Sequence, residues 1–233
     1  MTRDDLFNTN ASIVATLADS CAKNCPKAHL LIISNPVNST VPITAEILKR
    51  HNVYDPKRVF GVTTLDVLRA NTFVADSQGW EPRNTEVTVV GGHAGITILP
   101  LLSQIPNAKF TPQQIEALTN RIQFGGDEVV KAKDGAGSAT LSMASAGARF
   151  VNSIIRGLKG EKNVTECAFV SSPIVPGVEF FSTRVELGSN GVQNIHPIGK
   201  MSDSEKQWFD KMIPELKGSI AKGKEFASKW QPK

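Results

Sequence analysis

One strand–helix–strand unit restricts the possible folds more than any other part of the sequence. Leu30–Ile33 is a short, continuous apolar run that ends at Ser34–Pro36, a pattern typical of a strand covered on both faces within a parallel sheet. Thr40–His51 has helical character with Pro42 tolerated in its first turn, and Val59–Val62 has the composition of a second short strand. Because strand, helix and strand follow one another, we predict two parallel strands joined by a right-handed crossover.

Periodicity and turn signals predict the other elements. We expect helices over residues 4–24, 63–78, 111–122 and 138–158, a last helix from Ser202 with a kink at Pro214, and strands at 87–90, 164–171, 178–187 and 192–195. The segments that follow the parallel unit therefore predict an α+β unit attached to a piece of parallel α/β sheet.

Composition narrows the class of partner. The net charge of +4 is not concentrated in one run, and we interpret the basic stretches Lys131–Lys133 and Lys217–Lys229 as solvated faces, so no nucleic-acid partner is expected. No apolar run is long enough to span a bilayer, and no membrane partner is expected either. Cys21, Cys25 and Cys167 lack the density of a disulfide scaffold and are interpreted as ordinary buried thiols of a reducing compartment.

Three residue types with complementary chemistry fall at element ends. Asp66 and Arg69 lie three residues apart in the opening turns of a predicted helix, and His93 lies in a glycine-flanked turn after a predicted strand. Asp66 has an alternative interpretation as the N3 acid of a helix capped by Thr63, and Asn35 alone is an ordinary turn former before a proline. An acid, a cation and an imidazole that meet would form a site for moving a proton next to an anionic substrate.

Other catalytic motifs receive less support. Gly135–Thr140 has two glycines but follows a polar segment instead of a strand, so we interpret it as a helix start and not as a nucleotide-binding loop. The sequence has no GxSxG elbow, HExxH helix or CxxC pair, and no metal site is predicted.

The chain resembles the malate dehydrogenases of the lactate/malate dehydrogenase superfamily, and the mitochondrial type most closely. Five segments in this order carry the resemblance: Met1–Asn10, Asn35–Thr40, Val62–Arg69, Gly91–Gly95 and Gly137–Met143. The resemblance implies the rest of a Rossmann-type parallel sheet followed by the family's α+β C-terminal domain. In that family the reaction is the reversible, NAD-dependent oxidation of (S)-malate to oxaloacetate.

The resemblance also implies roles for individual residues. His93 matches the general acid/base, Asp66 the carboxylate that orients it, and Arg69 the arginine that holds the C1 carboxylate of the substrate. Arg3 matches a second substrate arginine on the active-site loop, and Asn35 a contact to the substrate and the nicotinamide side. Cofactor contacts to NAD are implied at Asn10, Asn35, Val37 and Met143.

The resemblance carries expectations about organisation as well. Residues 1–62 correspond to the carboxyl-terminal half of the NAD-binding domain and residues 63–233 to the catalytic, substrate-binding and dimerisation domain, within a homodimer of the mitochondrial matrix. The family's chain normally begins with a βαβ unit that carries the GxGxxG loop, and this sequence starts inside the active-site loop. We therefore expect weak NAD binding and self-association through an unpaired apolar strand. The alternative function is a catalytically inactive subunit that acts as a dimerisation or interaction partner.

Overall fold

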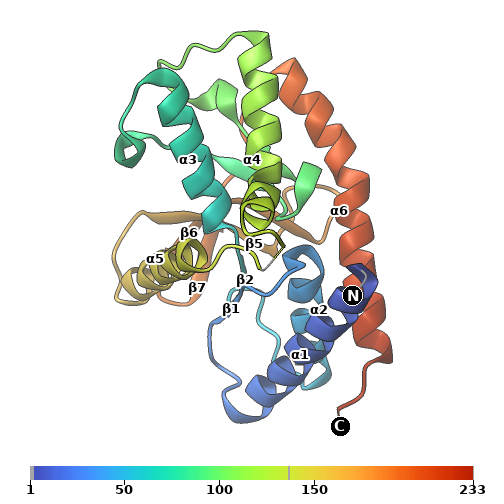
Figure 1. Cartoon of the computed structure of the whole chain (residues 1–233). Coiled ribbons are helices and arrows are strands. Elements are labelled where there is room, and N and C mark those ends of the chain that lie inside the picture. The colour runs from blue at the N-terminus through green and yellow to red at the C-terminus, as the bar shows by residue number, and fades with distance from the viewer. Residues whose placement is uncertain (1–2, 136, 233) are drawn as a thin grey trace.

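The computed structural model describes residues 3–135 and 137–232, with side chains from Phe7 onward. The helices and strands run in the order α1 (Arg3–Asn24), β1 (Leu30–Ile32), α2 (Val37–Arg50), β2 (Val59–Val62), α3 (Thr64–Gln78), β3 (Val89–Gly91), β4 (Ile98–Pro100), α4 (Pro112–Ala132), α5 (Leu141–Leu158), β5 (Val164–Ser171), β6 (Phe180–Gly188), β7 (Gly191–Ile195) and α6 (Asp203–Lys229). Figure 1 shows the sheet at the centre, with α6 along one side of the molecule and the end of α6 next to α1 and α2.

The strands form one mixed sheet of seven strands in the order β1-β2-β5-β6-β3-β4, and β7 pairs with β6. β1 and β2 are parallel, as the strand–helix–strand unit predicts, with Leu30 opposite Val59. The other pairings are antiparallel, and β2 joins β5 through Gly61 opposite Phe169. The α/β fold with its piece of parallel sheet and its α+β extension is confirmed. The sheet is continuous across residue 62, so the domain boundary there stays a prediction.

The caps of three helices explain where those helices begin. Thr111 and Ser202 each accept a hydrogen bond from the backbone N–H three residues later and complete the capping boxes of α4 and α6. α6 is continuous through Pro214, so the predicted kink does not interrupt the helix. α2 begins at Val37 and not at Thr40, because the Pro36 carbonyl already accepts the first helical hydrogen bonds. Pro42 consequently lies inside α2 and not in its first turn.

Two other helix boundaries differ from the prediction. α4 continues ten residues beyond the predicted end at Ile122, through a glycine pair that helix propensity disfavours. Those glycines, Gly125 and Gly126, lie against the side chain of Arg69, where a Cβ on Gly125 would come within 3.3 Å of Arg69 Cδ. α5 starts at Leu141 instead of Ser138, with Thr140 as its N-cap residue, and the preceding Gly135 and Gly137 adopt positive φ angles of 77° and 136°.

β1 is an edge strand whose two faces are covered only in part: Leu30 and Ile32 pack against one apolar cluster and Leu31 against another. Its three residues are only half-buried, and the following Ile33 is 41% exposed. Among the described residues β2 is its only partner, which leaves one row of its backbone groups unpaired. A cavity of about 190 Å³ lies between α1 and β1, with apolar side chains such as Val14 and Leu17 in its lining.

Candidate active site

The predicted acid and imidazole are in contact. Asp66, in the first turn of α3, is completely buried, and His93 follows β3 with its side chain 10% exposed. The distance between Asp66 Oδ2 and His93 Nδ1 is 2.5 Å, although the two residues are 27 positions apart in the sequence. Because Nδ1 is engaged, Nε2 is the ring nitrogen left to exchange a proton with a ligand.

The surroundings of His93 raise its pKa above the ordinary value of an imidazole. Burial disfavours the charged ring, but the negative charge of Asp66 and its hydrogen bond outweigh this effect. The positive charge of Arg69 opposes them by a smaller amount. The folded protein therefore holds a proton on His93 at a higher pH than a free histidine would.

The alternative interpretation of Asp66 as a helix-capping acid does not fit the contacts. One carboxylate oxygen of Asp66 binds His93, and Oδ1 is buried without a hydrogen-bond partner among the described residues. Thr63 occupies the N-cap position, but its hydroxyl donates to the Cys167 carbonyl oxygen at 3.1 Å and makes no side-chain cap. The side chain of Asp66 therefore serves His93 instead of the helix end.

Arg69 supplies a cation near this pair. It is half-buried on α3, and among the described residues its guanidinium forms no hydrogen bond or ion pair. Gly126 of α4 lies next to it, since a Cβ there would be at an ordinary contact distance of 3.7 Å from Arg69 Nη1. A guanidinium without a partner next to a buried imidazole is suited to an anionic ligand such as a carboxylate.

The residues predicted to contact a cofactor fall into three groups. Asn10 on α1 and Asn35 after β1 meet, with the Asn10 side-chain amide donating to the Asn35 carbonyl oxygen at 2.8 Å. The side chain of Val37 is completely buried in the core, so only its backbone could reach a ligand. Met143 is half-buried in the first turn of α5 and packs against the apolar cluster that contains Phe60.

Two further predictions concern Arg3 and the cysteines. Arg3 begins α1, but its side chain lies outside the described part of the chain. All three cysteines are free, as predicted, but Cys25 is exposed and not a buried thiol. The described residues hold no group of three or more side chains that could bind a metal ion. None of the described helices is long and apolar enough to cross a membrane.

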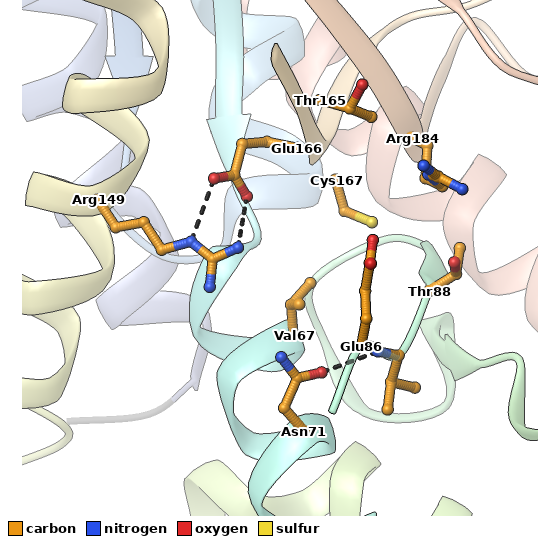
Figure 2. Close-up of a pocket in the computed structure, with 10 residues that line it drawn as sticks. Val67, Asn71, Glu86, Thr88, Arg149, Thr165, Glu166, Cys167 and Arg184 are labelled. Carbon is orange, nitrogen blue, oxygen red and sulfur yellow. Dashed lines mark hydrogen bonds and ion pairs between the residues drawn. The ribbon is translucent and has the colours of Figure 1, made fainter. Parts of the chain in front are cut away.

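A second, polar cavity lies away from the imidazole. Its volume is about 60 Å³, and residues of α3, α5, β5 and β6 and of the segment before β3 line it, as Figure 2 shows. Arg149 donates two hydrogen bonds to the buried Glu166 carboxylate at 3.1 and 3.2 Å, and burial raises the pKa of the neighbouring Cys167 thiol to about 11. Asp66, Arg69 and His93 do not line this cavity, and its cations and anions largely balance.

Sequence reasoning missed one residue of the histidine turn. Asn38, in the first turn of α2, is 1% exposed, and its side-chain oxygen accepts a hydrogen bond from the His93 backbone N–H at 2.7 Å. The residue belongs to the Asn35–Thr40 segment that carries the family resemblance. Its partner 55 positions away could not be recognised from spacing alone.

Family models match nearly the whole chain. Residues 63–227 match the lactate/malate dehydrogenase alpha/beta C-terminal domain, and residues 1–61 match the lactate/malate dehydrogenase NAD binding domain. The chain belongs to the lactate/malate dehydrogenase family.

The sequence is similar to individual curated malate dehydrogenases. Mitochondrial malate dehydrogenase of Caenorhabditis elegans is 62% identical over 227 residues, which are 97% of this chain and 66% of that protein. The human mitochondrial enzyme is 56% identical, over 97% of this chain and 67% of that protein, and the peroxisomal malate dehydrogenase 2 of Arabidopsis thaliana is 58% identical, over 98% and 65%. The chain thus spans about two thirds of the length of these curated relatives.

Solved structures agree on the fold. Malate dehydrogenase of Cryptosporidium parvum superposes with a TM-score of 0.80 at 26% identity, covering 97% of this chain and 73% of that one. The apo malate dehydrogenase of Picrophilus torridus also gives a TM-score of 0.80, over 99% of this chain and 72% of that one, and its 23% identity supports the fold alone.

Proposed function

We propose that this chain is the catalytic part of an NAD-dependent malate dehydrogenase, which interconverts (S)-malate and oxaloacetate. The observation that carries the proposal is the 2.5 Å contact between the buried Asp66 carboxylate and His93, beside the Arg69 guanidinium, which has no hydrogen bond or ion pair within the part of the chain that the structure describes. A base, a carboxylate that orients it and a cation for the substrate are what the reversible oxidation of a 2-hydroxy acid requires.

His93 moves the proton of the reaction. In the direction of oxidation, Nε2 takes the hydroxyl proton of malate, so the oxygen–hydrogen bond breaks as the carbonyl forms. Asp66 holds Nδ1 and stabilises the imidazolium that results, which is the effect seen in the raised pKa of His93. Bound NAD would accept the hydride from the same carbon. In the direction of reduction, the protonated ring returns its proton to the carbonyl oxygen.

Arginine side chains hold the anionic substrate. Arg69 would bind the C1 carboxylate of malate with two parallel hydrogen bonds, because a planar guanidinium matches a carboxylate in this way. Arg3 would supply a second cation from the start of α1, and Asn35 would contribute an amide from the loop after β1. The side chain of Asn35 is exposed, which supports this role.

The described residues fit the nicotinamide end of the cofactor. Asn10 and Asn35 are linked by a hydrogen bond at the carboxyl end of β1, where open α/β sheets bind their ligands. The backbone of Val37 and the half-buried Met143 would complete this end of the site.

Exposed apolar side chains support a homodimer. Ile13 and Leu17 on α1 are 52% and 59% exposed, and Val151 and Ile155 on α5 are 44% and 43% exposed. Apolar surface of this kind marks protein interfaces. We propose that the protein lies in the mitochondrial matrix because two of the three curated relatives named above are mitochondrial, with identities of 62% and 56%, beside 58% for the peroxisomal one.

The test is NADH oxidation by the purified chain with oxaloacetate, compared with pyruvate, and with His93→Asn as the control for contaminating host enzyme. We expect turnover that prefers oxaloacetate and is lost in the variant. Turnover that survives in His93→Asn, or a preference for pyruvate, would contradict the proposal. If neither protein turns over but the chain co-purifies with a full-length malate dehydrogenase, the alternative of a non-catalytic partner subunit is supported instead.

A further inference from the structure

The turn that carries His93 is held by a buried side chain from a distant helix. Asn38 Oδ1 accepts the His93 backbone N–H at 2.7 Å, and Asn38 Nδ2 donates to Thr97 Oγ1 at 3.0 Å. Asn38 is 1% exposed and Thr97 is completely buried. Both the oxygen and the nitrogen of the Asn38 amide therefore bind the turn that carries His93.

Thr97 closes this turn on itself. Its hydroxyl donates to the Ala94 carbonyl oxygen at 2.7 Å and accepts the Ala94 N–H at 3.1 Å, and its own carbonyl oxygen accepts the Gly92 N–H at 2.7 Å. Gly92 leaves the space for the amide, because a Cβ there would sit 2.5 Å from Asn38 Oδ1. The backbone on both sides of His93 is thus fixed by buried hydrogen bonds.

We infer that Asn38 is a positioning residue that sets the contact between His93 and Asp66 and ties it to the loop after β1. Asn38 is three residues from Asn35, so one short segment would carry both a substrate contact and the support of the imidazole. This inference rests on the proposed function for its catalytic meaning. Its structural part, the control of His93 by Asn38, can be measured without any turnover.

The expected change in the pKa of His93 follows from two opposing effects on the imidazole. Burial of the ring lowers its pKa, and the contact with Asp66 raises it. If the turn loosens, the imidazole moves away from the carboxylate while it stays largely buried, so the pKa of His93 falls. The proton acceptor would also lie further from the substrate, and a displacement of this kind costs on the order of a hundredfold in rate.

Histidine side-chain NMR on the full chain tests the inference. The chain has four histidines, and the resonance of His93 is identified by its loss in His93→Gln. The pKa of His93 is then measured in the wild-type chain, in Asn38→Ala and in Asn38→Asp, which keeps an oxygen acceptor for the His93 N–H. The matched control is Asn71→Ala, because Asn71 Oδ1 also accepts a backbone N–H, that of Val87 at 2.9 Å, before the same strand.

We expect a lower pKa for His93 in Asn38→Ala, no fall in Asn38→Asp and no change in Asn71→Ala. We also expect kcat/KM for oxaloacetate to drop on the order of a hundredfold in Asn38→Ala alone. An unchanged pKa in a folded Asn38→Ala, or an equal fall in Asn71→Ala, would overturn the inference. If Asn38→Ala does not fold, the same titration of Thr97→Val tests the inference, and we expect a lower pKa for His93 in that variant as well. If the wild-type chain has no turnover, the proposed function fails while the pKa still decides the role of Asn38.

Discussion

The substitution Asp66→Asn tests the electrostatics of the buried pair, because it removes the charge of the carboxylate and keeps its shape. In the wild-type protein the carboxylate is completely buried and the imidazole is 10% exposed, with 2.5 Å between Oδ2 and Nδ1. At about 4 Å between charge centres and an effective dielectric constant of about 20, the attraction is about 4 kcal/mol. This value is the upper limit of what the substitution can remove.

The lower limit comes from the alternative open to the variant, which is to fold with a neutral imidazole. Discharging a histidine with an ordinary pKa of about 6.5 at about pH 5 costs about 2 kcal/mol, at 1.36 kcal/mol for each pH unit. We therefore expect Asp66→Asn to lower the free energy of unfolding by about 2–4 kcal/mol at about pH 5.

The pH dependence has a fixed sign. Because folding raises the pKa of His93, its stabilisation is complete below the unfolded pKa and is lost as pH rises through the folded pKa. Urea unfolding of both proteins from about pH 5 to pH 9 should therefore show a difference that narrows with pH. A difference that stays constant or widens would refute this reasoning. Asp19→Asn, which removes the carboxylate bound to His51 at 2.8 Å, is the matched control and should leave the titration of His93 unchanged.

Three further predictions concern the substrate cation, the core and the surface. Arg69→Lys keeps the positive charge but loses the bidentate hydrogen bond to the carboxylate, so kcat/KM for oxaloacetate should fall about 10- to 100-fold in steady-state assays. An unchanged kcat/KM would show that Arg69 does not bind the substrate carboxylate. Phe150→Ala empties a completely buried site 5.7 Å from the Phe60 ring, and chemical unfolding should show a loss of about 3–5 kcal/mol; a loss below about 1 kcal/mol would mean that the site collapses. Leu17→Glu places a charge on the exposed apolar surface of α1 and should reduce self-association in analytical ultracentrifugation, whereas an unchanged sedimentation profile would exclude this surface.

Much of the fold is readable from local signals. The apolar run of Val59–Val62, the capping boxes at Thr111 and Ser202 and the turn before β7 each depend on neighbours a few residues away, and the structure has them where the sequence predicts. The predicted end of α4 was wrong, because the sequence near it does not reveal contacts with distant residues. α4 continues past Ile122 through two glycines that lie against Arg69 of α3, and no local propensity indicates this contact.

Some features of the candidate site were also readable from the sequence, and others needed the structure. Asp66, Arg69 and His93 could be predicted because each has a reactive side chain at an element end, and the resemblance assigned their roles. The distance between Asp66 and His93 depends on how α3 packs beside β3 and could not be read from the sequence. Asn38 was missed because an asparagine in a helix start is ordinary until the structure supplies its partner. Val37 illustrates the reverse case, since the structure buries the side chain of a residue predicted to contact the cofactor.

The most direct measurement of the proposed proton exchange is the pH dependence of kcat/KM for oxaloacetate reduction, recorded beside the NMR titration of His93. Reduction needs the protonated ring, so the rate should be highest at low pH and fall as pH rises through the same pKa that the titration gives. That pKa should lie above the ordinary value of histidine. If kcat/KM does not fall with rising pH, or if the same fall persists in His93→Asn, the assignment of His93 as the group that exchanges the proton is contradicted.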